Sequence, residues 1–458
     1  MNKIVARNVL LLLEHLRKEN FLKYLDEIKP YQNLPRNKII EIQRNKLENL
    51  LRFVTTENTF YKNKYSGHDV FSGFDSLPVL TKEELRDNYK KILSNKVRRP
   101  IDLVETSGST GKPLQFYRDR KMFGYNLAAL YRSRLWWEIE IGDKEAMLWG
   151  VPVSRLPRLK AKLRDLLLNR FREIEYNINP KTLWDFYRKI VRRKPAYIFG
   201  YTSMIHEFSM FLKANQINLK ISKLKAVICT AEKLYNNQRN DIIEVFGCPV
   251  ISEYGATETG IIAHSCPNGS LHINDDCLYI EIVDDNYKPV KDGQTGRVLV
   301  TVLNSHSSPI IRYDIGDIAS KKETKCSCGV NFSSLNEIEG RISDVIFTPS
   351  GKIFHSIIFY YIFKRFTERY GGINQYKIIQ TNLSKLEIFL VPQNTFTKKK
   401  EVILIEMIRE KLGSDLVLEI ISCQQIKREK SGKLRDFKTF LDVNENLHRV
   451  YSEVCKLS

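Results

Sequence analysis

The sequence predicts an α/β protein with a large N-terminal domain, built on mixed sheets, and a small α+β C-terminal domain. Two observations carry this prediction. In the middle of the 458-residue chain, apolar runs at 196–199 and 224–229 alternate with helical patterns at 204–212 and 237–246, as in a sheet covered by helices. Beyond residue 340 a helix, a strand, a second helix and a second strand follow in turn, which is typical of a separate compact domain.

The chain is too long for one ordinary domain, so at least two domains are expected. We expect an N-terminal domain at 1–340 and a C-terminal domain at 341–458. Hairpin-forming strands at 279–283 and 297–303 flank a turn rich in Asp, Asn and Gly. They predict a β-rich subdomain over about 266–340, inside the N-terminal domain.

Composition places the protein among soluble globular chains, with 43% hydrophobic and 28% charged residues. No apolar run approaches the roughly 18 residues of a membrane span. The short apolar stretch at 9–13 ends at Glu14 and lacks a cleavage site of small residues, so we expect an amphipathic helix there. Eight scattered cysteines do not form a disulfide framework, and a cytoplasmic location is therefore expected.

The net charge of +20 suits nucleic acid, an anionic membrane surface or small polyanions. Nucleic acid is disfavoured because the chain has no zinc-finger spacing, RNA-binding aromatic signature or basic-zipper heptads. Residues 155–172 combine seven Lys or Arg residues with leucines at helical spacing. We expect a helix that packs through its leucines and keeps its basic face in water; peripheral membrane contact through 155–172 is the alternative.

The segment ETSGSTGKP at 105–113 packs four hydroxyls, two glycines and a lysine into nine residues. Such a loop can direct amide N–H groups, hydroxyls and a positive charge at phosphate oxygens. It is not a Walker loop, because Thr106 replaces the first glycine and Pro113 replaces the magnesium-binding hydroxyl. Strand-like runs on both sides, at 101–104 and 114–117, predict a hairpin loop over a ligand, with a solvated turn as the alternative.

Three candidate strands of the central region run directly into polar turns, at 200–203, 230–232 and 253–258. Their hydroxyls and carboxylates therefore lie beyond the carboxyl ends of strands, where open α/β sheets bind ligands. We expect one crevice to gather all three turns.

Taken in order, six motifs resemble those of the AMP-forming acyl-adenylate synthetases, over almost the whole chain. Within that superfamily the chain is most similar to the phenylacetate-CoA ligase branch, including the CapK-like proteins associated with capsule polysaccharide biosynthesis. The Arg312-Tyr313 pair, the CSCG segment and the CPNGSLHI segment point to this branch. The six motifs are ETSGSTGKP at 105–113, TAE at 230–232, EYGATE at 253–258, IRYDIGD at 311–317, GRISD at 340–344 and KSGKLR at 430–435.

The resemblance implies an enzyme that joins a small carboxylic acid to AMP, with ATP and Mg²⁺, and passes the acyl group to a thiol, usually of coenzyme A. Other acceptors stay open, namely a carrier-protein arm or a sugar amine, and so does the identity of the acid. The competing hypothesis is a non-enzymatic basic protein that binds a membrane or a polyanion. Retention of the loop hydroxyls and of Lys433 favours the enzyme.

By the same resemblance, the catalytic residues are Lys433, Thr257 and Glu258, with Glu258 placing Mg²⁺ on a phosphate oxygen. Lys433 would reach from a mobile C-terminal lid to neutralise charge in the transition state. The hinge is either Ser343 or Asp344. The nucleotide-binding residues are Thr106, Ser107, Gly108, Ser109, Thr110, Gly111 and Lys112 at the phosphates, Ala231, Glu232, Tyr254 and Gly255 at the adenine, Asp317 at the ribose, and Arg341 near the ribose or phosphates. Glu253 is a further nucleotide-binding residue.

Three cysteines and one histidine predict a structural zinc site: Cys266, His272, Cys326 and Cys328. A Cys₃His set suits tetrahedral Zn²⁺ and leaves no open position for catalysis. Similar Cys/His segments occur in the branch that the chain resembles. Cys-x-Cys is tighter than usual zinc spacing, and Cys277 is an alternative ligand. The competing interpretation is that these are ordinary cytoplasmic cysteines with an incidental histidine.

Overall fold

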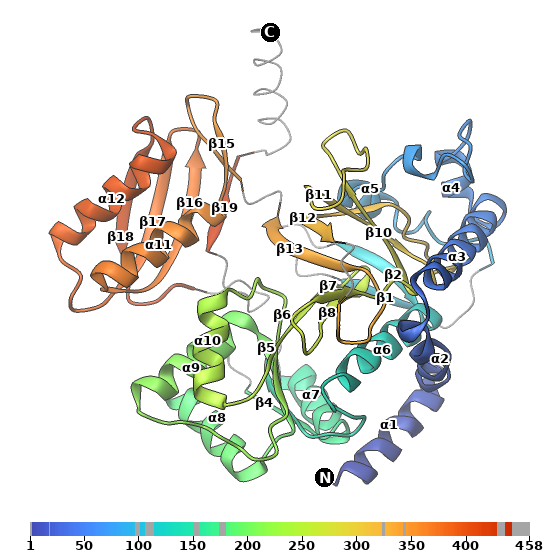
Figure 1. The fold of residues 1–458 in the computed structure, drawn as a ribbon, viewed down its shortest axis with the longest axis horizontal. Helices are drawn as coiled ribbons and strands as arrows, with labels where there is room; N and C mark the ends of the chain where they lie inside the picture. The colour runs from blue at the N-terminus through green and yellow to red at the C-terminus, as the bar shows by residue number, and fades with distance from the viewer. Residues whose placement is uncertain are drawn as a thin grey trace. The chain divides into compact units, whose positions relative to one another are not determined.

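The computed structural model describes residues 2–17, 19–96, 101–105, 114–149, 155–173, 180–322, 326–341, 345–427 and 436–441. The chain divides into two compact units. The first comprises Met1–Ile315 and Ala319–Ile338, and the second comprises Gly316–Ile318 and Glu339–Ser458. Helices and strands occur throughout both, and the predicted α/β class is confirmed (Figure 1).

The first unit opens with helices, and those that follow the first one bury apolar side chains against the sheet. In α3, Ile39, Leu47 and Leu50 are buried because they recur at helical spacing. The side chains of this region share one apolar core with the antiparallel strands of the sheet. The helices are α1 (Lys3–Arg17), α2 (Phe21–Ile28), α3 (Arg36–Glu57), α4 (Thr59–Lys64) and α5 (Lys82–Asn88), with 3₁₀ turns at Lys29–Asn33 and Phe74–Ser76.

An eleven-stranded sheet forms the centre of the fold, in the order β10-β11-β12-β13-β9-β8-β7-β6-β5-β3-β4. Neighbours from β4 to β7 run parallel, whereas β7, β8, β9 and β13 pair antiparallel in sequence. The strands are β3 (Glu145–Leu148), β4 (Arg170–Glu173), β5 (Tyr197–Tyr201), β6 (Ala226–Thr230), β7 (Val250–Ala256), β8 (Gly260–Ser265), β9 (Leu271–Ile273), β10 (Leu278–Val283), β11 (Thr295–Val302), β12 (Tyr313–Lys322) and β13 (Ser334–Arg341).

Helices cover the parallel half of this sheet, and their aromatic side chains fill its second core. Phe186, Phe208 and Phe246, from three successive helices, are fully buried there. The helices of this half are α7 (Arg155–Leu167), α8 (Pro180–Arg193), α9 (Thr202–Ala214) and α10 (Asn236–Phe246).

A separate hairpin carries the flanks of the hydroxyl-rich loop. Strands β1 (Ile101–Glu105) and β2 (Gln115–Asp119) pair antiparallel, as predicted, with Glu105 opposite Gln115. Helix α6 (Arg120–Leu135) starts at once, because Asp119 Oδ1 accepts a hydrogen bond from the Met122 amide at 2.6 Å. The loop itself, 106–113, lies outside the described residues.

The second unit folds around its own apolar core. In β17, Leu386, Ile388 and Leu390 alternate with more exposed residues, so one face of its sheet is buried. Helices α11 (Ile357–Tyr370) and α12 (Lys398–Leu412) supply the other side of that core. The strands are the hairpin β14 (Val345–Phe347) and β15 (Ile353–His355), and the four-stranded sheet β18 (Val417–Ser422), β17 (Lys385–Pro392), β16 (Ile373–Asn382) and β19 (Phe437–Thr439).

The strands at about 266–340, where the β-rich subdomain is expected, belong to the same sheet as the parallel strands, because β8 and β9 join the two halves. The segment 155–172 contains the expected helix, but two of its leucines are not packed inside: Leu163 and Leu166 expose 58% and 63% of their surface. Among the described helices, none is both long and apolar enough to cross a membrane.

A buried ion pair ties α6 to the connection between β9 and β10. The Arg132 guanidinium donates to both carboxylate oxygens of Asp276, at 2.7 and 2.9 Å, and to Asn274 Oδ1 at 2.8 Å. It also donates to the Ile28 carbonyl at the end of α2, at 3.1 Å. Both charged side chains are excluded from water, so each depends on the other for solvation.

Replacing Asp276 with Asn should therefore lower the free energy of unfolding by about 3–5 kcal/mol, because the Arg132 charge stays buried without its counterion. Urea unfolding, followed by tryptophan fluorescence, measures the change. As a control, Lys38→Ala removes a solvent-exposed pair with Glu41 and should leave stability unchanged. Equal stability of Asp276→Asn and the wild type would show that the pair does not organise the fold.

Candidate functional site

The ends of three parallel strands lie side by side, as the sequence predicts. Tyr201, the last residue of β5, pairs with Thr230 at the end of β6, and Thr230 pairs with Glu253 of β7. The Thr230 hydroxyl also donates to the Glu253 carbonyl at 3.0 Å. The turns that follow β5 and β6 therefore emerge at one edge of the sheet.

The turn after β6 is bound to the start of α9. Ala231 adopts a left-handed backbone conformation, with φ of 67°, which turns the chain sharply. The Glu232 carboxylate then accepts a hydrogen bond from the Ser203 amide at 2.7 Å, and the Thr202 hydroxyl donates to the Glu232 carbonyl at 3.1 Å. An acidic group at a helix N-terminus is stabilised by the helix dipole. Glu232 thus links the β5 and β6 turns.

The third predicted turn is partly strand. β7 continues through Ala256, because its last residues pair with β8, with an irregularity between Tyr254 and Gly255. Side chains alternate along a strand, so Glu253 points into the core while Tyr254 packs, half-buried, against the other side. The turn predicted at 253–258 is therefore shorter than expected and begins only after Ala256.

Glu253 belongs to a buried polar network beneath this edge. Its Oε2 lies 3.9 Å from Arg134 Nη2 and 3.8 Å from His264 Nε2. Burial raises the pKa of Glu253, and burial together with the Arg134 charge lowers the pKa of His264 to about 3, so His264 is neutral. Arg134 also donates to the Tyr197 hydroxyl, at 3.1 Å. This network supports the strand end from inside the protein.

The turn between β7 and β8 carries Thr257, which is exposed, and Glu258, which is buried. The Tyr313 hydroxyl donates to Glu258 Oε1 at 3.3 Å. Asn126, in α6, accepts a hydrogen bond from the Ile261 amide at 2.7 Å and so holds the end of the turn. Sequence analysis assigned no role to Asn126 or to the Tyr313 side chain, since both contacts join segments far apart in the chain.

Gly260 is required at this turn for two reasons. Its φ of +81° lies in the left-handed region, and a Cβ there would lie 2.2 Å from Asn126 Oδ1. Gly255 is equally constrained, because a Cβ would lie 2.6 Å from the Gly260 carbonyl oxygen. Both glycines allow β7, β8 and α6 to approach closely around Glu258.

The remaining predicted nucleotide-binding residues are spread over other elements. Asp317 lies in β12 and is partly exposed, and Arg341 is the last residue of β13. Near Asp317 in the chain, Arg312 is buried against Glu281, with its Nη2 2.9 Å from Oε1. Thr106, Ser107, Gly108, Ser109, Thr110, Gly111, Lys112, Lys433 and the hinge candidates Ser343 and Asp344 lie outside the described residues.

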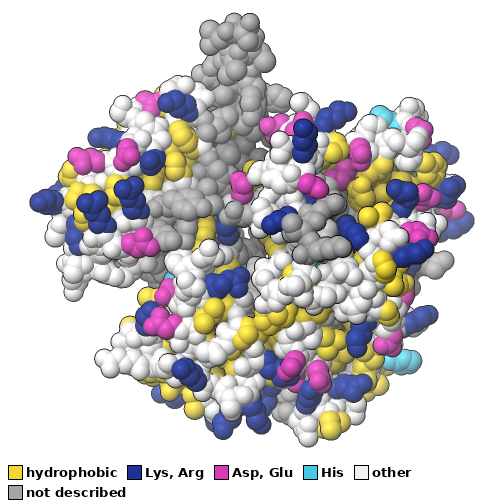
Figure 2. Space-filling view, in the orientation of Figure 1, with side chains coloured by type: hydrophobic (Ala, Val, Ile, Leu, Met, Phe, Trp, Pro, Cys, Tyr) yellow, Lys and Arg dark blue, Asp and Glu magenta, His cyan; other side chains and the backbone are white. Residues whose placement is uncertain are grey.

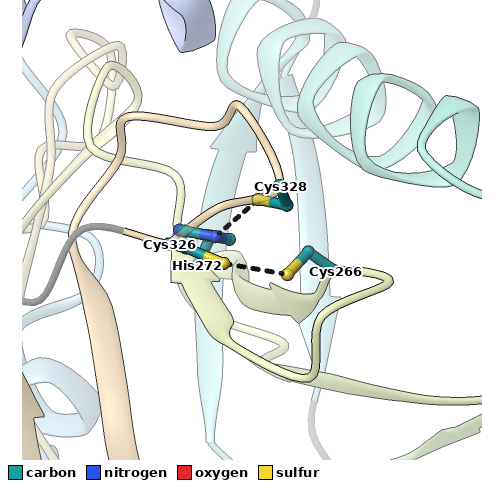
Figure 3. A group of neighbouring side chains, drawn as sticks. All are labelled: Cys266, His272, Cys326 and Cys328. Atoms are coloured by element: carbon teal, nitrogen blue, oxygen red, sulfur yellow. Dashed lines mark hydrogen bonds between the residues drawn. The ribbon is translucent and has the colours of Figure 1, made fainter.

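The four predicted zinc ligands come together in the first unit (Figure 3). Their ligand atoms all lie within 4.8 Å of one another. Cys266 Sγ is 3.7 Å from Cys326 Sγ, and Cys328 Sγ is 3.3 Å from His272 Nε2. Cys277, the alternative ligand, lies in the apolar core instead.

A tight turn after Cys266 and the Phe332 carbonyl orient the ligands of the Cys/His cluster. The Cys266 amide donates to the Ser270 carbonyl at 2.9 Å, and this turn leads into β9, which carries His272. His272 Nδ1 lies 3.1 Å from the Phe332 carbonyl oxygen, so the Nδ1–H tautomer leaves Nε2 to face the sulfurs. Trp136 packs edge-on against His272, with ring centroids 5.9 Å apart.

Two family models match the chain in succession. The model described as "AMP-binding enzyme" matches residues 96–302, and the model described as "CapK C-terminal domain" matches residues 346–439. The first match spans the hairpin, the parallel strands and the Glu258 turn, and the second lies within the second compact unit.

Whole-chain relatives agree with these matches. The chain is 25% identical over 395 residues to the protein CapK of Staphylococcus aureus, covering 83% of this chain and 84% of that protein. It is 25% identical over 354 residues to phenylacetate-coenzyme A ligase of Thermus thermophilus, covering 69% and 73%.

A solved structure shares the fold. The crystal structure of 2-hydroxyisobutyryl-CoA ligase in complex with 2-HIB-AMP has a TM-score of 0.72 at 18% sequence identity, over 92% of this chain and 94% of that chain. The family models and the two relatives support the AMP-forming ligase superfamily, CapK-like branch.

Proposed function

We propose that the protein is an AMP-forming acid–thiol ligase, which activates a carboxylic acid with ATP and Mg²⁺ and then transfers the acyl group to coenzyme A. The observation that carries this proposal is the meeting of the β5, β6 and β7 ends inside the segment that matches AMP-binding enzymes. The names of the Thermus relative and of the solved 2-hydroxyisobutyryl-CoA ligase support coenzyme A as the acceptor.

In this reaction an anionic carboxylate must attack an anionic phosphate. The site therefore requires hydrogen-bond donors and positive charge around both groups. When bound, ATP supplies the AMP group and pyrophosphate as the leaving group. Glu258 suits Mg²⁺, since a hard cation prefers carboxylate oxygens and Tyr313 orients one of the two oxygens of Glu258. Thr257 is the exposed hydroxyl beside it. Residues 106–112 would hold the phosphates, and Lys433 would neutralise charge in the transition state.

The adenosine would lie against the strand ends. Ala231, Glu232, Tyr254 and Gly255 would flank the adenine, with Glu253 supporting β7 from within. Asp317 would accept hydrogen bonds from the ribose hydroxyls, and Arg341 would lie near the ribose or phosphates. The acid would occupy a pocket formed in part by 200–204. In this proposal 1–340 forms the adenylating domain, 341–458 the mobile lid, and Ser343 or Asp344 the hinge.

Alternatives to this proposal concern which acid is activated and which acceptor receives the acyl group. Similarity to Staphylococcus aureus CapK over most of both chains supports a role in capsule polysaccharide biosynthesis, in which a sugar amine or a carrier protein would replace coenzyme A. A non-enzymatic membrane- or polyanion-binding role is the other alternative. We propose that the enzyme acts in the cytoplasm.

Purified protein should catalyse acid-dependent exchange of pyrophosphate into ATP when a panel of aryl, fatty and amino acids is supplied. Lys433→Ala should slow this exchange by roughly two to three orders of magnitude, as loss of one preorganised charge does. Transfer from a supplied acyl-adenylate to coenzyme A, carrier protein or sugar amine should survive and identify the acceptor.

The exposed Lys427, close to Lys433 in the chain, provides the matched control, and Lys427→Ala should leave exchange unchanged. Absence of exchange with the whole panel, together with absence of ATP binding, would refute the proposed enzyme. Equal loss of both half-reactions in Lys433→Ala would instead mean that Lys433 supports the fold.

The turn that holds Glu258 provides a second test. Gly260→Ala should weaken stability by roughly 1–3 kcal/mol and slow exchange, because the new Cβ displaces Asn126 and strains the backbone. The exchange rate should also need more Mg²⁺ to saturate. Gly293→Ala is the control, since Gly293 has φ of +82° but no atom within 4 Å of an added Cβ. If both variants show the same exchange rate and the same Mg²⁺ dependence, the Glu258 turn does not place Mg²⁺ for the reaction.

We also infer that Cys266, His272, Cys326 and Cys328 hold a structural zinc ion. Bond lengths of 2.3 Å place two sulfurs of a tetrahedral zinc site about 3.8 Å apart. The Cys266–Cys326 distance of 3.7 Å matches this, and it is far too long for a disulfide. Four protein ligands fill the tetrahedron, so the ion would bind no substrate. It would instead join the turn before β9 to the turn before β13.

Protein purified without chelator should contain about one equivalent of zinc by elemental analysis. Combined Cys326→Ser and Cys328→Ser substitutions should remove the metal and lower the melting temperature, because the two turns lose their common anchor. Cys423→Ser, in the second unit, should change neither quantity. Metal-free protein whose melting temperature does not respond to added zinc would rule the site out.

A further inference from the structure

We propose that α1 and α7 together form a peripheral binding surface for membranes that contain anionic lipids. Both helices belong to the first unit, and they lie against each other there. The surface does not depend on the proposed enzymatic function. Figure 2 shows hydrophobic and basic side chains, with a few acidic ones among them, over the lower part of the molecule, where Figure 1 places α1 and α7.

The inner face of α1 is fixed by specific contacts. Lys3 forms ion pairs with Glu140 at 2.6 Å and with Asp143 at 3.2 Å. Ala6 is buried, and a Cβ at Gly142 would lie only 2.5 Å from the Lys3 carbonyl oxygen. These contacts determine which face of α1 packs against the rest of the unit.

This packing leaves an apolar face of α1 in solvent. Ile4, Val5, Leu12 and Leu16 expose 66%, 50%, 59% and 67% of their surface. Positions 5, 12 and 16 lie on one face of the helix, because seven and eleven residues make about two and three turns. Single exposed apolar residues are ordinary, but a row of them along one helix marks an interaction site.

The neighbouring α7 presents leucines outward for a different reason. Its only acidic residue, Asp165, is buried in a bidentate ion pair with Arg172 of β4, with both N–O distances at 2.5 Å. Since Asp165 must face β4, Leu163 and Leu166 turn toward solvent, where more than half of each is exposed. The buried pair thus decides which face of α7 is free.

Charge favours an anionic membrane over a protein partner. Arg7, Lys162 and Arg164 are exposed on the same two helices, and Lys or Arg beside leucines is the composition of interfacial helices. A second copy of the chain would bring one +20 molecule against another through basic surfaces, which electrostatic repulsion opposes. α1 has 15 residues, too few to span a bilayer, so it would lie along the surface.

Co-sedimentation with lipid vesicles tests the proposal. The wild type should bind vesicles of phosphatidylcholine mixed with phosphatidylglycerol, and should not bind phosphatidylcholine alone. Combined Leu12→Asp, Leu16→Asp, Leu163→Asp and Leu166→Asp substitutions should weaken binding by at least about tenfold, because they remove the inserted apolar groups. Lys162→Gln and Arg164→Gln should each weaken it by about fivefold.

Val402→Asp is the matched control, since Val402 is 48% exposed in the second unit, and it should bind like the wild type. Circular dichroism should show that the leucine variant stays folded. If that variant binds as tightly as the wild type, net charge alone attracts the vesicles and the proposal fails. It also fails if vesicles do not bind and ultracentrifugation shows a dimer that the leucine substitutions dissociate, because a second copy then covers the face.

Discussion

The buried pair of Arg132 and Asp276 is the interaction on which the first unit depends. Two opposite charges without water are stable only when they pair with each other and are well hydrogen-bonded. Here that condition requires α2, α6 and the β9–β10 connection to meet at one point. The preceding residue, Asp275, adds a second link, because it pairs with Arg36 of α3 at 2.5 Å and accepts a hydrogen bond from the Ser333 amide at 2.7 Å. The N-terminal helices are thereby held on the sheet in one arrangement.

Strand β8 joins the two candidate sites of the first unit. It begins directly after the Glu258 turn and ends one residue before Cys266. Its start is held by Asn126 of α6, and its end adjoins the Cys/His cluster. A zinc ion in that cluster would restrain β8 from one end, while α6 restrains it from the other. A structural metal remote from the reacting groups would in this way help to preorganise Glu258, which matters because electrostatic stabilisation of a transition state depends on fixed positions.

The buried polar groups under the strand ends also fix one arrangement of the fold, as the Arg132–Asp276 pair does. Arg134, Glu253 and Tyr197 lie in the interior, and Tyr197 in turn donates to Glu145 at 2.7 Å. Burying such groups is unfavourable unless they pair with one another, so they specify one packing of β3, β5 and β7. The same principle acts at α7, where the buried Asp165–Arg172 pair accompanies the exposure of Leu163 and Leu166.

The sequence by itself determined the α/β class, the β1–β2 hairpin, the order of the parallel strands' polar turns and the grouping of Cys266, His272, Cys326 and Cys328. These follow from periodicity, turn residues and motifs, which are local properties or match a known family. Only the tertiary structure decided that β7 runs to Ala256, that one sheet contains both halves of the first unit, and that the Leu163 face of α7 is exposed. It also decided that Asn126 and Tyr313 hold the Glu258 turn. Each of these depends on partners distant in the chain, such as β8 or Arg172, and a local pattern does not reveal which distant partner will satisfy a hydrogen bond or a buried charge.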